Sequence, residues 1–218
     1  MIEIDLDAEI VKAGYEEVAD ILNGEFFEGP RESQKSGIGL YSVYPGWNGD
    51  LCWISSGNQA GFDFFDKYFE LLDVAAKTKS VIGDCGELIM YSGFFVTRSV
   101  TNEPFYHVDY GADVGTNAFT LMTPVKPTGD IGNLLYHNTD GEELVYHYSP
   151  GTAVCFGGGF YHSTEPFQSA DPYVFLCFTF GVTDMTLWDS IAATAANQGA
   201  FYRHPQHGIV RCDQNVEG

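Results

Sequence analysis

The strongest constraint on the fold is a run of short strand-like segments that fills residues 87–182. Segments rich in β-branched and aromatic residues, such as YVFLCFTFG, alternate there with Gly, Pro, Asn and Asp, which favour turns. About eight short strands at regular spacing are typical of an antiparallel sandwich, barrel or jelly roll. One turn is especially clear, because Asp140 and Gly141 separate two such segments and predict a β-hairpin.

Helical patterns flank this β-rich part on both sides. Apolar residues recur at helical spacing over 8–23 and over 62–77, and a last helix is predicted to begin at 184–185. The stretch 24–50 is rich in Gly, Pro and Ser, which predicts a surface loop with short strand pieces. The longer Gly- and aromatic-rich segment 24–61 is a candidate substrate lid. The tail after the last helix is predicted to be surface loop.

The chain length and the order of these patterns predict one domain over residues 1–218. We expect a helical and loop part at about 1–86, a β-core at about 87–182, and a C-terminal helix and tail at 183–218.

The charge balance limits the partners. Thirty acidic residues against ten Lys and Arg give a net charge of −20, and no cluster of basic residues is visible in the sequence. Such a chain repels phosphate backbones and anionic bilayers, so we expect neither nucleic acid nor membrane as a partner. The same field favours the approach of a cationic small molecule.

The cysteines and the first residues indicate the compartment. The five cysteines show no Cys-x-x-Cys spacing, and Cys155 and Cys177 lie in apolar runs, which predicts buried free thiols. The opening MIEIDLDAEI has no basic region followed by an apolar one, so a signal peptide is not expected. These features favour a cytoplasmic protein.

A histidine and an aspartate lie two positions apart in PFYHVDYG, as His107 and Asp109. If this segment is extended, both side chains point to the same side and can converge on one metal ion. An isolated pair of this kind also arises by chance. A third candidate ligand, His162, follows in YSPGTAVCFGGGFYHSTEP after a turn and a strand.

This order of motifs resembles the double-stranded β-helix of the Fe(II)- and 2-oxoglutarate-dependent dioxygenases, most of all their prolyl-hydroxylase-like branch. The resemblance covers roughly 90–182. It implies a mainly β fold with flanking helices, a jelly roll of cupin-like type. It also implies that His107, Asp109 and His162 hold Fe(II), and that 2-oxoglutarate and O₂ take the open positions on the metal. An aspartate at 109 argues against the halogenase variant, which keeps that position free for chloride.

The sequence departs from the family where a cation binds the distal carboxylate of 2-oxoglutarate. The family usually has Arg or Lys in the strand after the second histidine, and here that place holds Pro172 and its neighbours. The candidate substitute is Arg98, because in this fold the first core strand lies beside the last. The alternative is that Arg98 points outwards and pairs with Glu87 or Glu103.

The resemblance also assigns a hydroxyl near the cosubstrate to Thr123. A shift of one residue or more in the alignment would assign Thr120 or Leu121 instead. Lys126 lies in a Pro-flanked loop and is expected to be solvated.

The function that the resemblance implies is that of a non-haem iron oxygenase, which oxidises an unactivated C–H bond of a small, cationic or amino-acid-like substrate with 2-oxoglutarate as cosubstrate. Trp47, Trp53 and Tyr106 are candidates for the substrate mouth. Two alternatives stay open, an iron oxygenase that does not use 2-oxoglutarate and a non-catalytic jelly-roll module that binds a small ligand. A cupin-type lyase is disfavoured, because the chain has no His-x-His pair.

Overall fold

The computed structural model describes residues 1–22, 29–33, 35–125 and 132–212, and the side chains of 29 and 43–47 are not described. Its main element is an eight-stranded antiparallel sheet of order β1-β9-β6-β11-β5-β4-β3-β2. The strands in that order are Ile2–Asp5, Thr152–Phe156, Ala118–Pro124, Phe167–Val182, Leu88–Thr101, Leu51–Ser56, Gly39–Trp47 and Gly29–Glu32. The predicted mainly β fold with flanking helices is confirmed.

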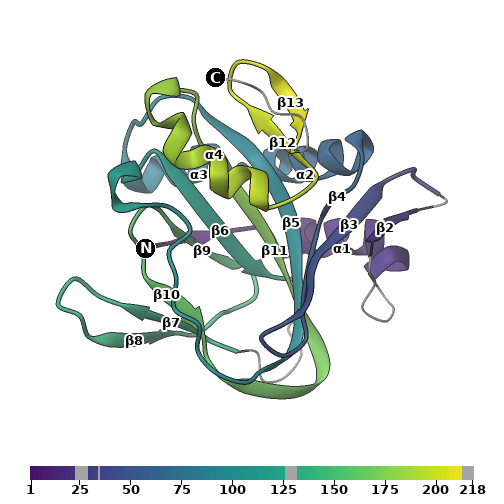
Figure 1. Ribbon diagram of the computed structural model, residues 1–218, viewed down its shortest axis with the longest axis horizontal. Coiled ribbons are helices and arrows are strands. Elements are labelled where there is room, and N and C mark those ends of the chain that lie inside the picture. Colours follow the sequence, from purple (N-terminus) through teal and green to yellow (C-terminus); the bar gives the residue numbers. More distant parts are fainter. Residues whose placement is uncertain (23–28, 34, 126–131, 213–218) are drawn as a thin grey trace.

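A small second sheet completes the β-core. It has the order β10-β7-β8, with β10 at His162–Thr164, β7 at Leu134–His137 and β8 at Glu143–Tyr146. Strands β7 and β8 form the predicted hairpin around Gly141, which has a φ of 80°. Figure 1 shows this hairpin projecting from the body of the molecule.

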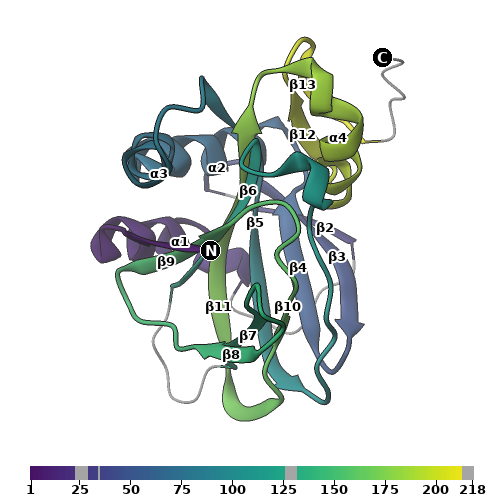
Figure 2. The same ribbon diagram turned by 90° about the vertical axis from the view of Figure 1, so that its left-hand side faces the viewer.

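Three helices cover the outer face of the large sheet: α1 (Ala8–Leu22), α2 (Gln59–Leu71) and α3 (Val74–Ile82). Figure 2 shows them gathered on one side of it. Aromatic residues fill the interface between these helices and the sheet. For example, Phe69 of α2 packs against Phe178 of β11 with ring centroids 5.6 Å apart. Burial of such rings is the main source of stability in a core of this kind.

The inner face of the large sheet is different. Alternate residues of each strand point inwards, so Phe94 and Val96 of β5 and Phe175 and Cys177 of β11 line the inside, whereas Phe95 packs against the helices. Both faces are therefore buried. The inner face and the small sheet enclose the region where the candidate site lies.

Two predicted elements differ in detail. The helix expected over 62–77 is two helices, which separate at Asp73, whose φ of 53° lies in the left-handed region that Asp tolerates better than most residues. The stretch 24–50, expected to be surface loop with short strand pieces, contains β2 and β3, and β4 follows it directly; all three strands extend the large sheet. Strand β4 carries no polar alternation because helices cover one of its faces and the core covers the other.

The C-terminal part is more ordered than predicted. The last helix begins with a 3₁₀ turn at Met185–Leu187 and continues as α4 (Trp188–Asn197), close to the expected start. The tail then forms a hairpin, β12 (Phe201–His204) with β13 (Gly208–Arg211). His204, expected on the surface, is buried against Trp188 with ring centroids 4.8 Å apart.

Two further predictions can be compared with the structure. All five cysteines are free, and Cys155 and Cys177 are buried as expected. None of the helices in the described part of the chain is long and apolar enough to cross a membrane.

Candidate metal centre

The three residues predicted as metal ligands lie together between the two sheets. His107 and Asp109 lie in the connection that follows β5, and His162 is the first residue of β10. A backbone bridge joins the two segments, because His107 N–H donates to the His162 carbonyl and His162 N–H donates to the His107 carbonyl, each over 3.0 Å. This bridge sets the two imidazoles side by side, with ring centroids 4.4 Å apart.

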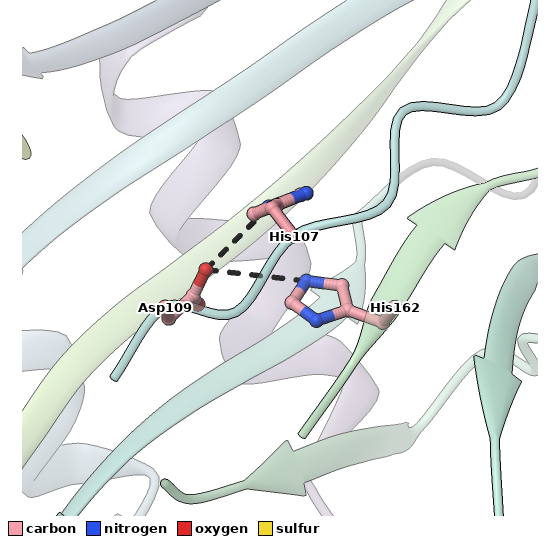
Figure 3. A group of neighbouring side chains, drawn as sticks. All are labelled: His107, Asp109 and His162. Carbon is pink, nitrogen blue, oxygen red and sulfur yellow. Dashed lines mark ion pairs between the residues drawn. The ribbon is translucent and has the colours of Figure 1, made fainter. Parts of the chain in front are cut away.

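The donor atoms converge on one point. Asp109 Oδ1 lies 3.6 Å from His107 Nε2 and 4.0 Å from His162 Nε2. The dashed lines in Figure 3 mark these two ion pairs. One ligand atom from each of the three residues falls within 4.8 Å of the other two. An ion about 2.1 Å from each of two donors can bridge a separation of up to about 4.2 Å. Both separations from Asp109 therefore fit one metal ion, and the two imidazoles lie near enough to each other that a small adjustment of the side chains completes the set.

The hydrogen bonds around the site orient both imidazoles. His107 Nδ1 lies 3.0 Å from the Phe105 carbonyl oxygen, and His162 Nδ1 lies 3.0 Å from the Phe160 carbonyl oxygen. A neutral imidazole that donates Nδ1–H to a carbonyl has its lone pair on Nε2. Both histidines thus present a lone pair towards Asp109, as metal ligands do.

Asp109 is oriented in the same way. Thr120 Oγ1 donates to Asp109 Oδ2 over 2.5 Å, which leaves Oδ1 facing the histidines. The hydroxyl of Thr194, on α4, donates to the backbone carbonyl of Asp109. The aspartate is therefore held at its carboxylate by strand β6 and at its backbone by helix α4.

The two histidines differ in exposure. The His162 side chain is 7% exposed, whereas that of His107 is 41% exposed. Burial lowers the pKa of the His162 imidazole; the Asp109 carboxylate opposes this shift and His107 adds to it. His162 is thus favoured in the neutral form that a metal requires.

A cavity of about 90 Å³ extends inwards from these residues. Its polar walls include Arg98 of β5, Tyr173 of β11 and Tyr148, and its apolar walls include Phe94 and Leu134, within a larger lining that contains all three predicted ligands. Arg98 is the register partner of Tyr173, so the guanidinium sits close to the place where the family has its cation. The alternative that Arg98 points outwards to Glu87 or Glu103 is wrong, since Arg98 is only 4% exposed.

The Arg98 guanidinium lacks a carboxylate partner. Its Nη1 donates to Thr101 Oγ1 over 2.8 Å, its Nε has no hydrogen-bond partner, and no ion pair with it occurs within the described ranges. Burial lowers its pKa, with Tyr173 and Asp50 opposing that shift. A buried cation without a counter-ion is costly, so the cavity suits an anionic ligand.

Thr123, predicted to lie near the cosubstrate, points away from the cavity. It is fully buried and its hydroxyl donates to the Thr152 carbonyl over 2.8 Å. Residues on β6 alternate between the two faces of the sheet, and Thr120 and Met122 are the ones that line the cavity. On β6, the hydroxyl that faces the cavity is therefore that of Thr120.

A second, wider cavity opens outwards from the same ligands. This outer groove has a volume of about 360 Å³. Its lining comprises Leu51, Trp53, Phe105, His107, Val108, Asp109, Thr194, Asn197 and Gln198. Trp53 thus lies at the site. The Trp47 side chain is not described, and Tyr106 stacks on Tyr161 with ring centroids 5.0 Å apart, outside both linings.

Sequence reasoning missed the contribution of α4 to the groove. Thr194, Asn197 and Gln198 follow the β-core in the chain, and no motif marks them. An asparagine and a glutamine at the end of a helix are common there and do not by themselves indicate a binding site. Only the packing of α4 over the Asp109 loop places them beside the candidate metal ligands.

Comparison by sequence finds no relative: no protein-family model and no curated protein matches the chain. Comparison by structure finds similar proteins. HygX from Streptomyces hygroscopicus, with nickel and 2-oxoglutarate bound, has a TM-score of 0.59 at 11% identity over 86% of this chain and 84% of HygX.

Two other solved structures are similar. The non-haem α-ketoglutarate-dependent epimerase SnoN from nogalamycin biosynthesis has a TM-score of 0.58 at 12% identity, over 84% of this chain and 78% of SnoN. A prolyl hydroxylase in complex with a hypoxia-inducible-factor peptide, from Trichoplax adhaerens, has a TM-score of 0.53 at 13% identity, over 88% and 86% of the two chains. The predicted fold is thus confirmed: this chain has the jelly-roll fold found in 2-oxoglutarate-dependent oxygenases, among them a prolyl hydroxylase.

Proposed function

We propose that the protein is a non-haem Fe(II) oxygenase that consumes 2-oxoglutarate and O₂ and oxidises a C–H bond of a small molecule. The observation that carries this proposal is the convergence of His107 Nε2, His162 Nε2 and Asp109 Oδ1, each oriented by a hydrogen bond at its other polar atom. Two imidazoles and one carboxylate are the donor set of non-haem Fe(II) oxygenases, and they leave adjacent positions on the metal open.

The inner cavity supports 2-oxoglutarate as the cosubstrate. The buried Arg98 guanidinium, with Tyr173 beside it, would bind the distal carboxylate, since an Arg–carboxylate pair is a strong charge-assisted contact. The metal ligands at the other end of the same cavity leave the keto-acid end of the molecule next to the metal. Thus one cavity provides for both ends of a short dicarboxylic acid.

The roles of the remaining residues follow from their positions. When bound, the iron with 2-oxoglutarate and O₂ supplies the oxidising power that breaks an unactivated C–H bond, while the cosubstrate is converted to succinate and CO₂. Thr120 and Thr194 hold Asp109 in place, and the aromatic wall at Phe94 keeps water from the inner cavity. The substrate would enter through the outer groove.

The decisive experiment is an anaerobic titration of the protein with Fe(II) and 2-oxoglutarate. Bidentate binding of the cosubstrate to iron gives a weak visible charge-transfer band, and we expect this band to appear. Iron binding without the band would instead indicate an oxygenase that does not use 2-oxoglutarate. No iron binding at all would contradict the proposal and indicate a non-catalytic binding module.

Two pairs of variants sharpen this titration. His107→Ala should abolish iron binding, whereas His137→Ala should not, although His137 lies near the site with its ring 5.0 Å from that of Tyr106. Arg98→Met should keep iron binding and lose the band at moderate 2-oxoglutarate concentrations. Its control is Arg203→Met, which removes a guanidinium paired with Asp66 elsewhere on the chain. An unchanged band in Arg98→Met would remove Arg98 from the cosubstrate site.

A further inference from the structure

The outer groove carries information about the substrate. Its volume of about 360 Å³ lies within the range of small-molecule sites, about 300–1,000 Å³. It shares His107 and Asp109 with the inner cavity, so a molecule in the groove lies next to the metal ligands. The following inference rests on the proposed function, because it treats this groove as the substrate site.

The body of the groove is apolar and aromatic. Leu51, Trp53, Phe105 and Val108 contribute to its walls, and Phe105 and Val108 are 51% and 44% exposed. Large apolar side chains that remain exposed beside a functional site mark a binding surface. The groove therefore suits a substrate with an apolar, ring-sized body.

The ionisable residues in the described lining are His107 and Asp109, and both are assigned to the metal. No basic side chain among them can pair with a carboxylate or phosphate, and no further acidic side chain can pair with an amine. An unpaired charge buried in such a groove would be costly. The net charge of −20 steers the approach of cations, but the groove lining decides what stays bound, and it favours a neutral molecule.

Two polar groups in the lining lack partners. Gln198 is only 7% exposed, and its Oε1 makes no hydrogen bond within the described parts of the chain. The indole N–H of Trp53 is also buried without a partner there. Both atoms are shielded from solvent, so they lie just beneath the wall of the groove, and a ligand can bond to them only after these side chains turn. Buried polar groups are normally hydrogen-bonded, so an unpaired acceptor and an unpaired donor in residues that line one groove point to a ligand that supplies both complements.

We infer that the substrate is a neutral molecule with an aromatic or alicyclic body and a polar group that both donates and accepts hydrogen bonds, such as a carboxamide. Gln198 is the residue that determines this specificity, with Trp53 as the second polar contact in the lining. The polar group anchors the molecule and the apolar body rests against Trp53 and Phe105. This arrangement holds a C–H bond near the metal ligands.

A set of three matched probes tests this inference: phenylacetamide, phenylacetate and phenethylamine. They share a phenyl ring and differ in charge. Binding is measured by saturation-transfer NMR titration, first without metal and then with Mn(II), whose paramagnetism broadens probe protons that lie near the triad. We expect phenylacetamide to bind about tenfold more tightly than either charged probe, and to be broadened by Mn(II).

Variants assign the selectivity to one residue. Gln198→Leu should weaken phenylacetamide binding about fivefold, which is the effect of one lost hydrogen bond. The control is Gln168→Leu, which changes an exposed side chain on β11 and should leave this binding unchanged. Gln198→Glu keeps the shape and adds a negative charge, so it should turn the preference towards phenethylamine. This variant also keeps the test valid if Gln198→Leu fails to fold.

The outcomes separate this inference from the proposed function. Three results would overturn the inference even if iron and 2-oxoglutarate bind as proposed. A charged probe could bind as tightly as phenylacetamide or more tightly, phenylacetamide could fail to bind, or the variants at position 198 could leave probe binding unchanged. Selective binding of phenylacetamide that depends on Gln198, in a protein that binds no metal, would support the groove chemistry while the oxygenase proposal fails.

Discussion

Thr120 is the residue that decides how Asp109 faces the two histidines. Its hydroxyl lies 2.5 Å from Asp109 Oδ2, so the carboxylate cannot rotate freely and Oδ1 remains directed at both imidazoles. Contacts of this kind around metal ligands hold the donor atoms ready for the ion, and their loss typically lowers metal affinity by about 10- to 100-fold.

Replacing Thr120 by Val removes the hydroxyl and keeps the shape of the side chain. We expect the dissociation constant for Mn(II), measured by the decrease of the free-ion signal in electron paramagnetic resonance, to rise about tenfold. The fold should persist, because valine at position 120 keeps the packing of the threonine side chain on β6. Thr123→Val is the matched control on the same strand: it loses the hydrogen bond to the Thr152 carbonyl and about 1 kcal/mol of stability, and it leaves Mn(II) affinity unchanged. Equal effects of the two substitutions on Mn(II) would contradict this role for Thr120.

The assignment of Thr123 from sequence went to the wrong face for a physical reason. A strand with one solvated face shows polar and apolar residues in alternation, which reveals the direction of each side chain. Strand β6 is buried on both faces, with helices outside and the cavity inside, so its sequence AFTLMTP carries no such contrast. The candidate ligands were easier to predict, because a His-x-Asp pair and a later His combine a rare set of residue types in a fixed order.

At the level of elements, the contact between α2 and β5 fixes the position of the strand that carries Arg98. Gly93 lets the two elements approach closely, because a Cβ at this position would lie 2.4 Å from Phe65 Cβ. Phe65 in turn packs against Phe95 with ring centroids 5.4 Å apart. Close packing of this kind tolerates no added methyl group without displacement of the helix or the strand.

We therefore expect Gly93→Ala to lower the free energy of unfolding by about 2–3 kcal/mol, measured by urea denaturation. Phe65→Leu alone should cost less than about 2 kcal/mol, since most of the apolar volume remains. Leucine keeps the Cβ and Cγ that the new methyl group would meet, at 2.4 and 2.5 Å, so the loss in the double variant should fall below the sum of the single losses by less than about 1 kcal/mol. A recovery of more than about 2 kcal/mol would show that the outer ring atoms of Phe65, rather than its Cβ and Cγ, limit the space at Gly93.

Element boundaries show where sequence patterns reach their limit. The apolar period over 62–77 continues through Asp73 without Gly or Pro, so nothing in the pattern marks the break between α2 and α3. Only tertiary packing against the curved sheet favours two short helices there. Strand β4 was not predicted either: LCWISS directly follows the predicted loop 24–50, and its pairing with β5 makes it a regular strand.

At the scale of the whole molecule, the candidate metal centre links the two sheets. His162 begins a strand of the small sheet, whereas His107 and Asp109 follow the long strand β5 of the large sheet. An ion held by all three would therefore cross-link the halves of the β-core. We propose that the chain folds as one domain, in which case this link stabilises the molecule as a unit.

Binding of Mn(II) should therefore raise the stability of the entire chain. A ligand that binds only the folded state at a hundredfold excess over its dissociation constant adds about 2.7 kcal/mol to the free energy of unfolding. We expect urea denaturation, followed by tryptophan fluorescence, to show a single transition that shifts by this amount with Mn(II) and does not shift in Asp109→Asn. Mg²⁺ should have a much smaller effect at equal concentration, because it prefers oxygen ligands to imidazole. If there are two unfolding transitions and Mn(II) shifts only one of them, the two sheets unfold separately. If Mn(II) shifts the transition of Asp109→Asn equally, the bound ion lies elsewhere on this acidic surface.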